Sequence, residues 1–364
     1  MNNLMHQHGG DLDAIEKLYG IPKDEIWDFS GNINPLGFPE SVKKAIAENV
    51  DIVTKYPDKR YTALKESIGS YTGANPKHIV VGNGSTELIS TFIKTANARE
   101  TIIIGPAYSE YEREASICGS DFRYFPLKED ENFEINITNL INELTEKVGM
   151  LIICNPNNPT GTAITTTQMR KILSHCKNNN TFVMVDETYI EFSDNIDEIC
   201  TIPLVEEFDN VFVIRGISKF FAAPGIRLGY GICSNEKFLN TLISVQDPWS
   251  VNVFAAFAGE RLFKDKDFIS KSKKLISDER KKAFAELSNW NNIKSYPSCS
   301  NFILLKLMTD KTNSAEIFDT LIKQKMLIRD AESFTFLDNS YLRFCILNPE
   351  QNEKLLSELK KIVE

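Results

Sequence analysis

Six short runs of apolar residues recur along the first two thirds of the chain, each followed by a stretch of helical length. They are HIVV (78–81), TIII (101–104), MLIIC (150–154), TFVMV (181–185), VFVIR (211–215) and YGIC (230–233). Because these runs do not alternate with polar residues, they predict strands buried on both faces of a mostly parallel sheet. The segments between them, such as 165–179 with its opening threonines, have the apolar spacing and capping residues of helices. The pattern predicts a three-layer α/β domain over roughly residues 40–250.

The pattern changes after about residue 250, where residues 255–290 predict one long amphipathic helix. Three apolar stretches come next, at 300–307, 321–330 and 341–347, and a charged helix ends the chain. These features are typical of a smaller α+β domain. We therefore expect an N-terminal arm that joins the small domain, a large domain and a small C-terminal domain, at residues 1–39, 40–248 and 249–364.

Composition narrows the class of protein. The 364 residues include 41 Lys and Arg against 50 Asp and Glu, a net charge of −9, which argues against a general nucleic-acid binder. No C-x-x-C motif occurs, and the cysteines are scattered, which favours free thiols in a reducing compartment over disulfides or a metal site. They lie at positions 118, 154, 176, 200, 233, 299 and 345. Without an apolar stretch for a signal peptide or a membrane span, we expect a cytoplasmic protein that binds no membrane.

The ends of the predicted strands carry the candidate chemistry, because ligands of an open parallel sheet bind beyond its carboxyl ends. After the first strand, GNGSTE (82–87) predicts a glycine-rich turn that leads into a helix. Glycines let backbone N–H groups approach a phosphate, and a helix N-terminus adds about half a positive charge. The motif lacks the third glycine of a dinucleotide fingerprint and the Lys of a Walker loop. An ordinary tight turn has the same features.

Three further strand ends carry polar residues. Asn158 lies in the turn CNPNNPTG, which its prolines stiffen, and Asp186 stands where a buried strand stops, with Tyr189 three residues later. Lys219 and Arg227 follow the next buried strand, where burial near other cations would lower the pKa of the lysine and make it a nucleophilic amine. Singly, each has an ordinary explanation: a loop, a paired carboxylate or a solvated lysine. Together, in this order at successive strand ends, they indicate one site.

The motifs NPNNPTG, DETY, SK and GIRLGY resemble those of the pyridoxal-phosphate enzymes with the aspartate-aminotransferase fold, called fold type I. The resemblance covers nearly the whole chain, from FSGNINPLG in the N-terminal arm to YLRF near residue 340. It implies a three-layer, mostly parallel large domain, a small α+β domain, and pyridoxal 5′-phosphate as the cofactor. It further implies that Lys219 binds the cofactor covalently and that Asp186 pairs with the pyridine nitrogen. Tyr189 and Asn158 would hydrogen-bond the phenolic oxygen.

The same resemblance implies the residues that hold the rest of the cofactor. Tyr108, in GPAYSEY, would stack on the ring. Tyr56, in KYPDKRY, would reach the phosphate bound by the neighbouring subunit, so a homodimer is implied. The cofactor phosphate would be bound by five residues: Gly84, Ser85, Thr86, Ser218 and Arg227.

Within this family the chain resembles two groups. It shares NPNNPTG, SK and YPD with the histidinol-phosphate aminotransferases and the threonine-phosphate decarboxylases. It resembles the decarboxylases also in the arm from HGG to NINPLG, in PWSVN, and in the spacing of Arg329 and Arg343. That resemblance implies that His8, Asn32 and Arg329 bind a substrate phosphate, and that a separate carboxylate site lies at Arg343. The full substrate site is expected at His8, Gly9, Asn32, Asn158, Arg329 and Arg343.

The resulting prediction is a homodimeric lyase that decarboxylates O-phospho-L-threonine to (R)-1-aminopropan-2-yl phosphate, for the nucleotide loop of cobalamin. The alternative is a histidinol-phosphate-type aminotransferase that uses 2-oxoglutarate and glutamate. Both would use the same residues and differ only in how the substrate is oriented, because the bond held perpendicular to the cofactor ring is the one that breaks. This bond is Cα–COO⁻ in the decarboxylase and Cα–H in the aminotransferase. A non-catalytic cofactor-binding protein is the third alternative, and intact Lys219 argues against it.

Two positions depart from the decarboxylase pattern, which often has Phe at Tyr108 and Ala at Gly31. The first change keeps an aromatic ring, whereas the second adjoins Asn32 and predicts a reshaped phosphate pocket. Phosphoserine, which lacks one methyl group, would be hard to exclude, because a methylene in an apolar pocket is worth only about 1–3 kcal/mol.

Overall fold

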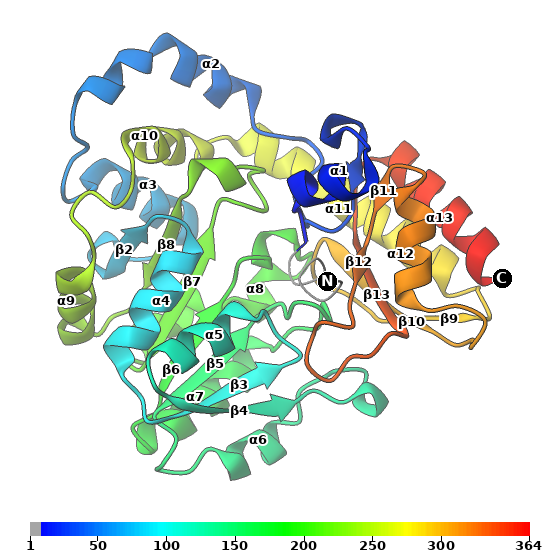
Figure 1. Ribbon diagram of the computed structural model, residues 1–364. Helices are drawn as coiled ribbons and strands as arrows, with labels where there is room; N and C mark the ends of the chain where they lie inside the picture. The colour runs from blue at the N-terminus through cyan, green and yellow to red at the C-terminus, as the bar shows by residue number, and fades with distance from the viewer. Residues whose placement is uncertain (1–8) are drawn as a thin grey trace.

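The computed structural model describes residues 9–364, and a seven-stranded sheet lies at the centre of that part of the chain (Figure 1). Across the sheet, the strands are β2 (Ile79–Gly82), β8 (Gly229–Ile232), β7 (Val211–Gly216), β6 (Phe182–Asp186), β5 (Met150–Cys154), β3 (Glu100–Gly105) and β4 (Asp121–Pro126). Strand β8 runs antiparallel to both its neighbours, and the other neighbouring strands are parallel. The predicted mostly parallel sheet is therefore confirmed, and each of the six apolar runs forms a strand.

Strand β4 is the strand of this sheet that the hydrophobic pattern did not indicate. It lies at the edge and pairs only with β3. Among its residues only Phe125 is buried, and the others are half-exposed or exposed. An edge strand needs no continuous apolar run, because part of its surface faces water.

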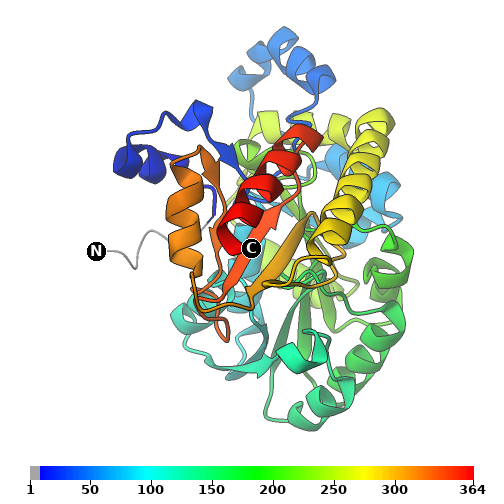
Figure 2. The ribbon, with the colours of Figure 1, turned by 90° about the vertical axis from the view of Figure 1, so that its right-hand side faces the viewer.

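Helices cover the sheet on both sides, which gives the three predicted layers (Figure 2). The helices before residue 250 are α1 (Leu12–Tyr19), α2 (Glu40–Glu48), α3 (Thr62–Thr72), α4 (Ser85–Ala96), α5 (Glu110–Ile117), α6 (Ile137–Glu143), α7 (Thr166–Asn178), α8 (Ile196–Ile199) and α9 (Glu236–Val245). Helix α7 begins at the predicted threonines: the Thr165 hydroxyl accepts the Gln168 N–H (3.2 Å), and Gln168 Oε1 accepts the Thr165 N–H (2.9 Å). This reciprocal capping box satisfies two backbone donors that the helix leaves unpaired.

The C-terminal part builds a second, antiparallel sheet, on which helices α11 (Lys266–Leu287), α12 (Ser314–Ile322) and α13 (Pro349–Val363) are arranged (Figure 2). Its strands, in order, are β12 (Arg329–Asp330), β13 (Tyr341–Cys345), β10 (Phe302–Leu307) and β9 (Ile293–Ser295). The N-terminal arm reaches this part through β1 (Trp27–Asp28), which pairs in parallel with β11 (Met326–Leu327). The domain boundaries after residues 39 and 248 remain a prediction.

The single long helix predicted over residues 255–290 is wrong. Two helices occupy this stretch, α10 (Val253–Leu262) and α11 (Lys266–Leu287). The side chain of Asp265 caps α11 by accepting the Phe268 N–H (3.0 Å). A short acidic side chain competes with the helix backbone for hydrogen bonds, so it starts a new helix where apolar spacing alone continues the old one.

Residues 9–364 bear on three features: membrane-spanning helices, metal sites and disulfide bonds. No helix in this range is long and apolar enough to cross a bilayer. The same range holds no group of three or more His, Cys, Asp or Glu side chains placed to bind a metal ion. All seven cysteines are unpaired in this structure.

A buried ion pair joins strand β7 to the end of β6. Arg215 donates from Nε (3.0 Å) and Nη2 (2.8 Å) to Glu187 Oε2, and Glu187 Oε1 accepts the Thr201 N–H (2.6 Å). The two charged side chains are 4% and 0% exposed. Removing one partner of such a pair leaves the other charge buried and uncompensated.

Arg215→Met should therefore lower the free energy of unfolding by about 3–5 kcal/mol, measured by urea denaturation. Arg170→Met is the matched control, because Arg170 makes the same two-pronged contact with Glu207 on the surface, where both side chains are 47% exposed. The control should cost less than about 1 kcal/mol. Equal losses in the two variants would contradict the argument from burial.

Candidate active site

A pocket lies where the carboxyl ends of β5, β6 and β7 meet the N-terminal arm and the C-terminal sheet. With its open mouth it encloses about 1140 Å³. Thirteen of the residues predicted for the site line it: Gly9, Asn32, Ser85, Thr86, Tyr108, Asn158, Asp186, Tyr189, Ser218, Lys219, Arg227, Arg329 and Arg343. Residues that follow successive strands in the sequence therefore lie together in one pocket, as expected for the carboxyl end of a parallel sheet.

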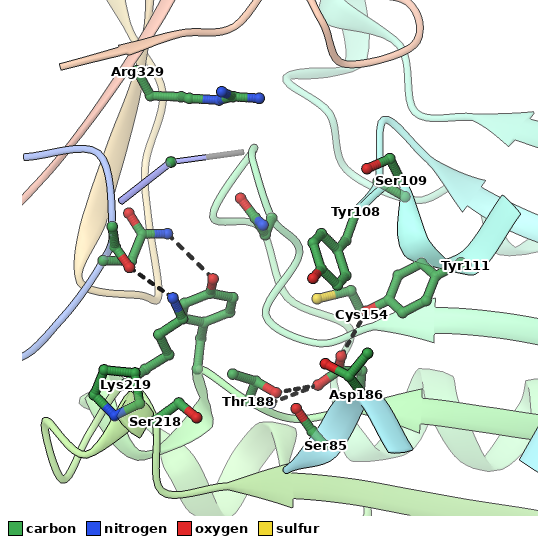
Figure 3. Close-up of a pocket in the computed structure, with 18 of the residues that line it drawn as sticks. Ser85, Tyr108, Ser109, Tyr111, Cys154, Asp186, Thr188, Ser218, Lys219 and Arg329 are labelled. Carbon is green, nitrogen blue, oxygen red and sulfur yellow. Dashed lines mark hydrogen bonds between the residues drawn. The ribbon is translucent and has the colours of Figure 1, made fainter. Parts of the chain in front are cut away.

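The lining is strongly cationic, although the chain carries a net charge of −9. Its charged members are one carboxylate, Asp186, and four cations: Lys219, Arg227, Arg329 and Arg343. Figure 3 shows Arg329 on the opposite side of the pocket from Lys219 and Asp186. This charge distribution favours ligands that carry more than one negative group.

Asp186 ends strand β6 and is held by three hydrogen bonds (Figure 3). Its Oδ1 accepts the N–H (2.9 Å) and the hydroxyl (2.5 Å) of Thr188, and its Oδ2 accepts the hydroxyl of Tyr111 (2.6 Å). Burial raises the pKa of this carboxyl, and these hydrogen bonds oppose the rise. The result is a carboxylate with a fixed direction at the base of the pocket.

Tyr111 and Thr188 were not predicted from the sequence. Thr188 lies two residues after Asp186, the spacing at which an Asp side chain commonly bonds the backbone ahead of it. Tyr111 lies three residues after Tyr108, in the first turn of helix α5, and the two rings meet edge to face with centroids 5.7 Å apart. The spacing after Asp186 was therefore the available signal for Thr188, whereas the Tyr111–Asp186 bond joins residues 75 positions apart.

Lys219 is half-buried, and its ammonium Nζ donates to the carbonyl oxygen of Gly31 (2.7 Å). Burial, and next the positive charge of Arg343, lower the pKa of Lys219 to about 8. About a tenth of the amine is therefore unprotonated at pH 7, far more than in an ordinary lysine, and this form can act as a nucleophile. The predicted combination of burial and neighbouring cations is present.

Arg329 and Arg343 are opposite each other on the paired strands β12 and β13. Both are almost fully buried, at 5% and 4% exposed, and burial lowers the pKa of each guanidinium. Arg343 donates to Asn158 Oδ1 and, from Nη2, to the Ser30 carbonyl (2.6 Å), while its Nε finds no partner among the described residues. Like charges directly opposite on neighbouring strands repel, so this arrangement favours anions between or beside them.

Asn32 and Tyr189 meet at the side of the pocket. Asn32 Nδ2 donates to the Tyr189 hydroxyl (3.3 Å), and the backbone of Asn32 has a positive φ of 56°. Its Oδ1 is buried without a hydrogen-bond partner among the described residues. Because buried polar atoms are nearly always paired, this oxygen requires a donor from outside the described residues.

The start of helix α4 forms a tight cradle. Gly84 precedes the helix with φ +82°, and a Cβ there would lie 2.4 Å from Nη2 of Arg227. A Cβ on Gly229 would lie 2.5 Å from the backbone nitrogen of Ser85. Only glycine fits at these positions, and the arrangement brings a guanidinium and a helix N-terminus together, which suits a phosphate group. The pocket therefore offers an amine, a fixed carboxylate and a phosphate cradle, and these groups fit the aldehyde, the ring nitrogen and the phosphate of pyridoxal phosphate.

Of the predicted residues, one lies away from the pocket and one is outside the described part of the chain. Tyr56 is 81% exposed and packs its ring against Trp249, with centroids 4.7 Å apart, so it does not line this pocket. Its predicted contact involves a neighbouring subunit. His8 lies outside the described residues, next to Gly9, which does line the pocket.

Comparisons with known proteins agree with this geometry. Residues 24–359 match the family described as aminotransferase class I and II. The chain is 37% identical to a protein of Caldanaerobacter subterraneus subsp. tengcongensis that is provisionally named a threonine-phosphate decarboxylase. The alignment covers 99% of this chain and 94% of that protein. It is 32% identical over 98% of its length to 96% of the threonine-phosphate decarboxylase of Salmonella typhimurium.

The fold is also that of a solved relative. The histidinol-phosphate aminotransferase from Clostridium acetobutylicum superposes with a TM-score of 0.86 at 33% identity, over 92% of this chain and 98% of that one. The chain belongs to the aminotransferase class I and II family, and pyridoxal phosphate is its cofactor.

Proposed function

We propose that this protein is a lyase that decarboxylates O-phospho-L-threonine to (R)-1-aminopropan-2-yl phosphate, which is used for the nucleotide loop of cobalamin. The observation that carries the proposal is the buried pair Arg329 and Arg343, which supplies two separate anion sites in one pocket. A phosphorylated amino acid has two such anions, a phosphate and an α-carboxylate. The decarboxylase names of the relatives support the same assignment.

Pyridoxal phosphate, when bound, supplies an electron sink for the pair left on the substrate α-carbon. Lys219 would be its covalent attachment point, and Asp186 would pair with its ring nitrogen. Tyr108 would stack on the ring, and Tyr189 and Asn158 would bind the phenolic oxygen. The cofactor phosphate is assigned to Gly84, Ser85, Thr86, Ser218 and Arg227.

The chain's own residues then divide the remaining work. Arg343 binds the α-carboxylate through its planar fork, and Arg329, with Gly9 and Asn32, binds the phosphate. The predicted contribution of His8 to the phosphate site belongs to the same proposal. Lys219 carries the proton that replaces the lost carboxylate at the α-carbon, because its lowered pKa lets Nζ both gain and lose a proton near neutral pH.

The proposal includes a homodimer in the cytoplasm. An exposed Tyr56 beside Trp249 supports the dimer, since an aromatic pair on the surface suits contact with a second subunit. The Tyr56 hydroxyl then reaches the cofactor phosphate of the neighbouring subunit. Unpaired cysteines support a reducing compartment.

The second candidate is a histidinol-phosphate-type aminotransferase, which the similarity to the Clostridium acetobutylicum enzyme favours. One incubation separates the two functions. With O-phospho-L-threonine, we expect the holoenzyme to release CO₂ while its visible cofactor absorbance returns fully. An aminotransferase would instead release no CO₂ and lose that absorbance until 2-oxoglutarate restores it.

Arg329→Met should raise KM for O-phospho-L-threonine by about tenfold to a hundredfold, because charge-assisted hydrogen bonds to the phosphate are lost. Steady-state CO₂ release measures the change. L-threonine is the control substrate, since it lacks the phosphate and should react equally poorly with both forms of the enzyme. An equal rise in KM for L-threonine would remove Arg329 from the phosphate site.

Gly229→Ala should weaken pyridoxal phosphate binding by about tenfold or more, because the new Cβ would meet backbone atoms of the cradle, which cannot turn aside. Absorbance titration of the apoenzyme gives the dissociation constant. Gly225→Ala is the matched control, because a Cβ there meets nothing within 4 Å. Similar constants for both variants would show that the cradle does not hold the phosphate.

A further inference from the structure

A carboxylate outside the pocket organises the turn that enters it. Asp28 ends strand β1, and its Oδ1 accepts three hydrogen bonds: from the Ser30 N–H (2.8 Å), the Ser30 hydroxyl (2.6 Å) and the Gly31 N–H (3.1 Å). Ser30 and Gly31 line the pocket, whereas Asp28 does not. One side chain therefore fixes the backbone of the two residues that follow it.

The two carbonyl groups of that turn face two cations of the pocket. The Ser30 carbonyl accepts from Arg343 Nη2 (2.6 Å), and the Gly31 carbonyl accepts from Lys219 Nζ (2.7 Å), a bond drawn in Figure 3. Adjacent carbonyls with different partners require a defined backbone conformation. The contacts from Asp28 supply it.

Gly31 makes room for this carboxylate. A Cβ at Gly31 would lie 2.7 Å from Asp28 Oδ2 and 3.7 Å from the Cα of Gly10, and no atom of Lys219 or Arg343 is among its nearest neighbours. The absent side chain thus points at Asp28. The structure gives no support to the expectation that this glycine reshapes the phosphate pocket.

The turn is also tied to the start of the arm. The hydroxyl of Ser30, which donates to Asp28, accepts the N–H of Gly10 (2.9 Å). Gly9, the preceding residue, lines the pocket, and a Cβ there would lie 2.3 Å from the Ser30 carbonyl oxygen. The backbone of the arm therefore rests directly on the turn that Asp28 holds.

We propose that Asp28 is a positioning residue, which holds the turn 28–31 so that its carbonyl groups orient the Lys219 amine and the Arg343 guanidinium. The inference rests on the proposed roles of Lys219 and Arg343 in binding the cofactor and the α-carboxylate. The Gly31 carbonyl is the docking point of the lysine amine whenever that amine is not covalently attached. The Ser30 carbonyl keeps one prong of the arginine fork in place.

Asp28→Ala should raise KM for O-phospho-L-threonine by about tenfold, because Arg343 loses its fixed acceptor. Asp28→Asn keeps an oxygen that can accept the same three hydrogen bonds, so its KM should stay within about twofold of the unchanged enzyme. Asp13→Ala is the control on the same arm, since Asp13 pairs with Lys23 at the surface and touches nothing in the pocket. A KM for Asp28→Ala equal to that of the control would overturn the proposal.

A second readout does not depend on the substrate. In full-length apoprotein, labelling of Lys219 by an amine-reactive reagent is followed by mass spectrometry at pH 7. Asp28→Ala should increase the labelling rate about tenfold, because the amine loses both its carbonyl partner and a nearby negative charge. An equal labelling rate with and without the substitution would overturn the inference. Failure of the proposed function alone would appear differently: the enzyme without the substitution would release no CO₂, but the difference in labelling rate would remain.

Gly31→Ala provides a test that does not remove the carboxylate. Its methyl group would displace Asp28 Oδ2, so the variant should raise KM in the unchanged enzyme and add nothing in the Asp28→Ala background. Thermal unfolding of each variant confirms that it folds. Additive effects of the two substitutions would contradict the assigned contact.

Discussion

Two buried guanidinium groups at facing positions of adjacent strands set the conditions for the rest of the active site. Each is costly to bury, and each makes burial of the other more costly. Neutral hydrogen-bond acceptors, rather than a carboxylate, reduce this cost at Arg343. The guanidinium donates to the carbonyl of Ser30 and to the side-chain oxygen of Asn158. Neutral acceptors leave the positive charge in place for a ligand, whereas a carboxylate would have cancelled it.

The same charge acts on the amine of Lys219. Arg343 contributes to the lowered pKa of Lys219, so the residue that we propose to bind a substrate carboxylate also favours the unprotonated amine. Asp186 shows the opposite arrangement, a carboxylate kept in its direction by Tyr111 and Thr188. The pocket thus has a cationic region around Arg329 and Arg343 and, apart from it, the negative charge of Asp186. A bound ligand is therefore favoured in the orientation that places its anionic groups near the two arginines.

Much of this could be predicted from the sequence, because the information was local. Fully apolar runs marked six central strands, and the polar residues directly after them fell at one edge of the sheet. Strand β4 was missed because half its surface faces water, and the break at Asp265 was missed because apolar spacing continues across it. Tyr111 and the role of Asp28 depend on contacts between distant segments, which no spacing along the chain reveals.

The pairing of β1 with β11 has a consequence for how the protein is made. Residues 27 and 28 find their partners at residues 326 and 327, so the arm has no strand to join until almost the whole chain has left the ribosome. The central sheet closes much earlier, since its last strand ends at Ile232. The nascent enzyme therefore passes through a stage with a formed sheet and an unfinished pocket, and strand β1 is among the last elements to pair.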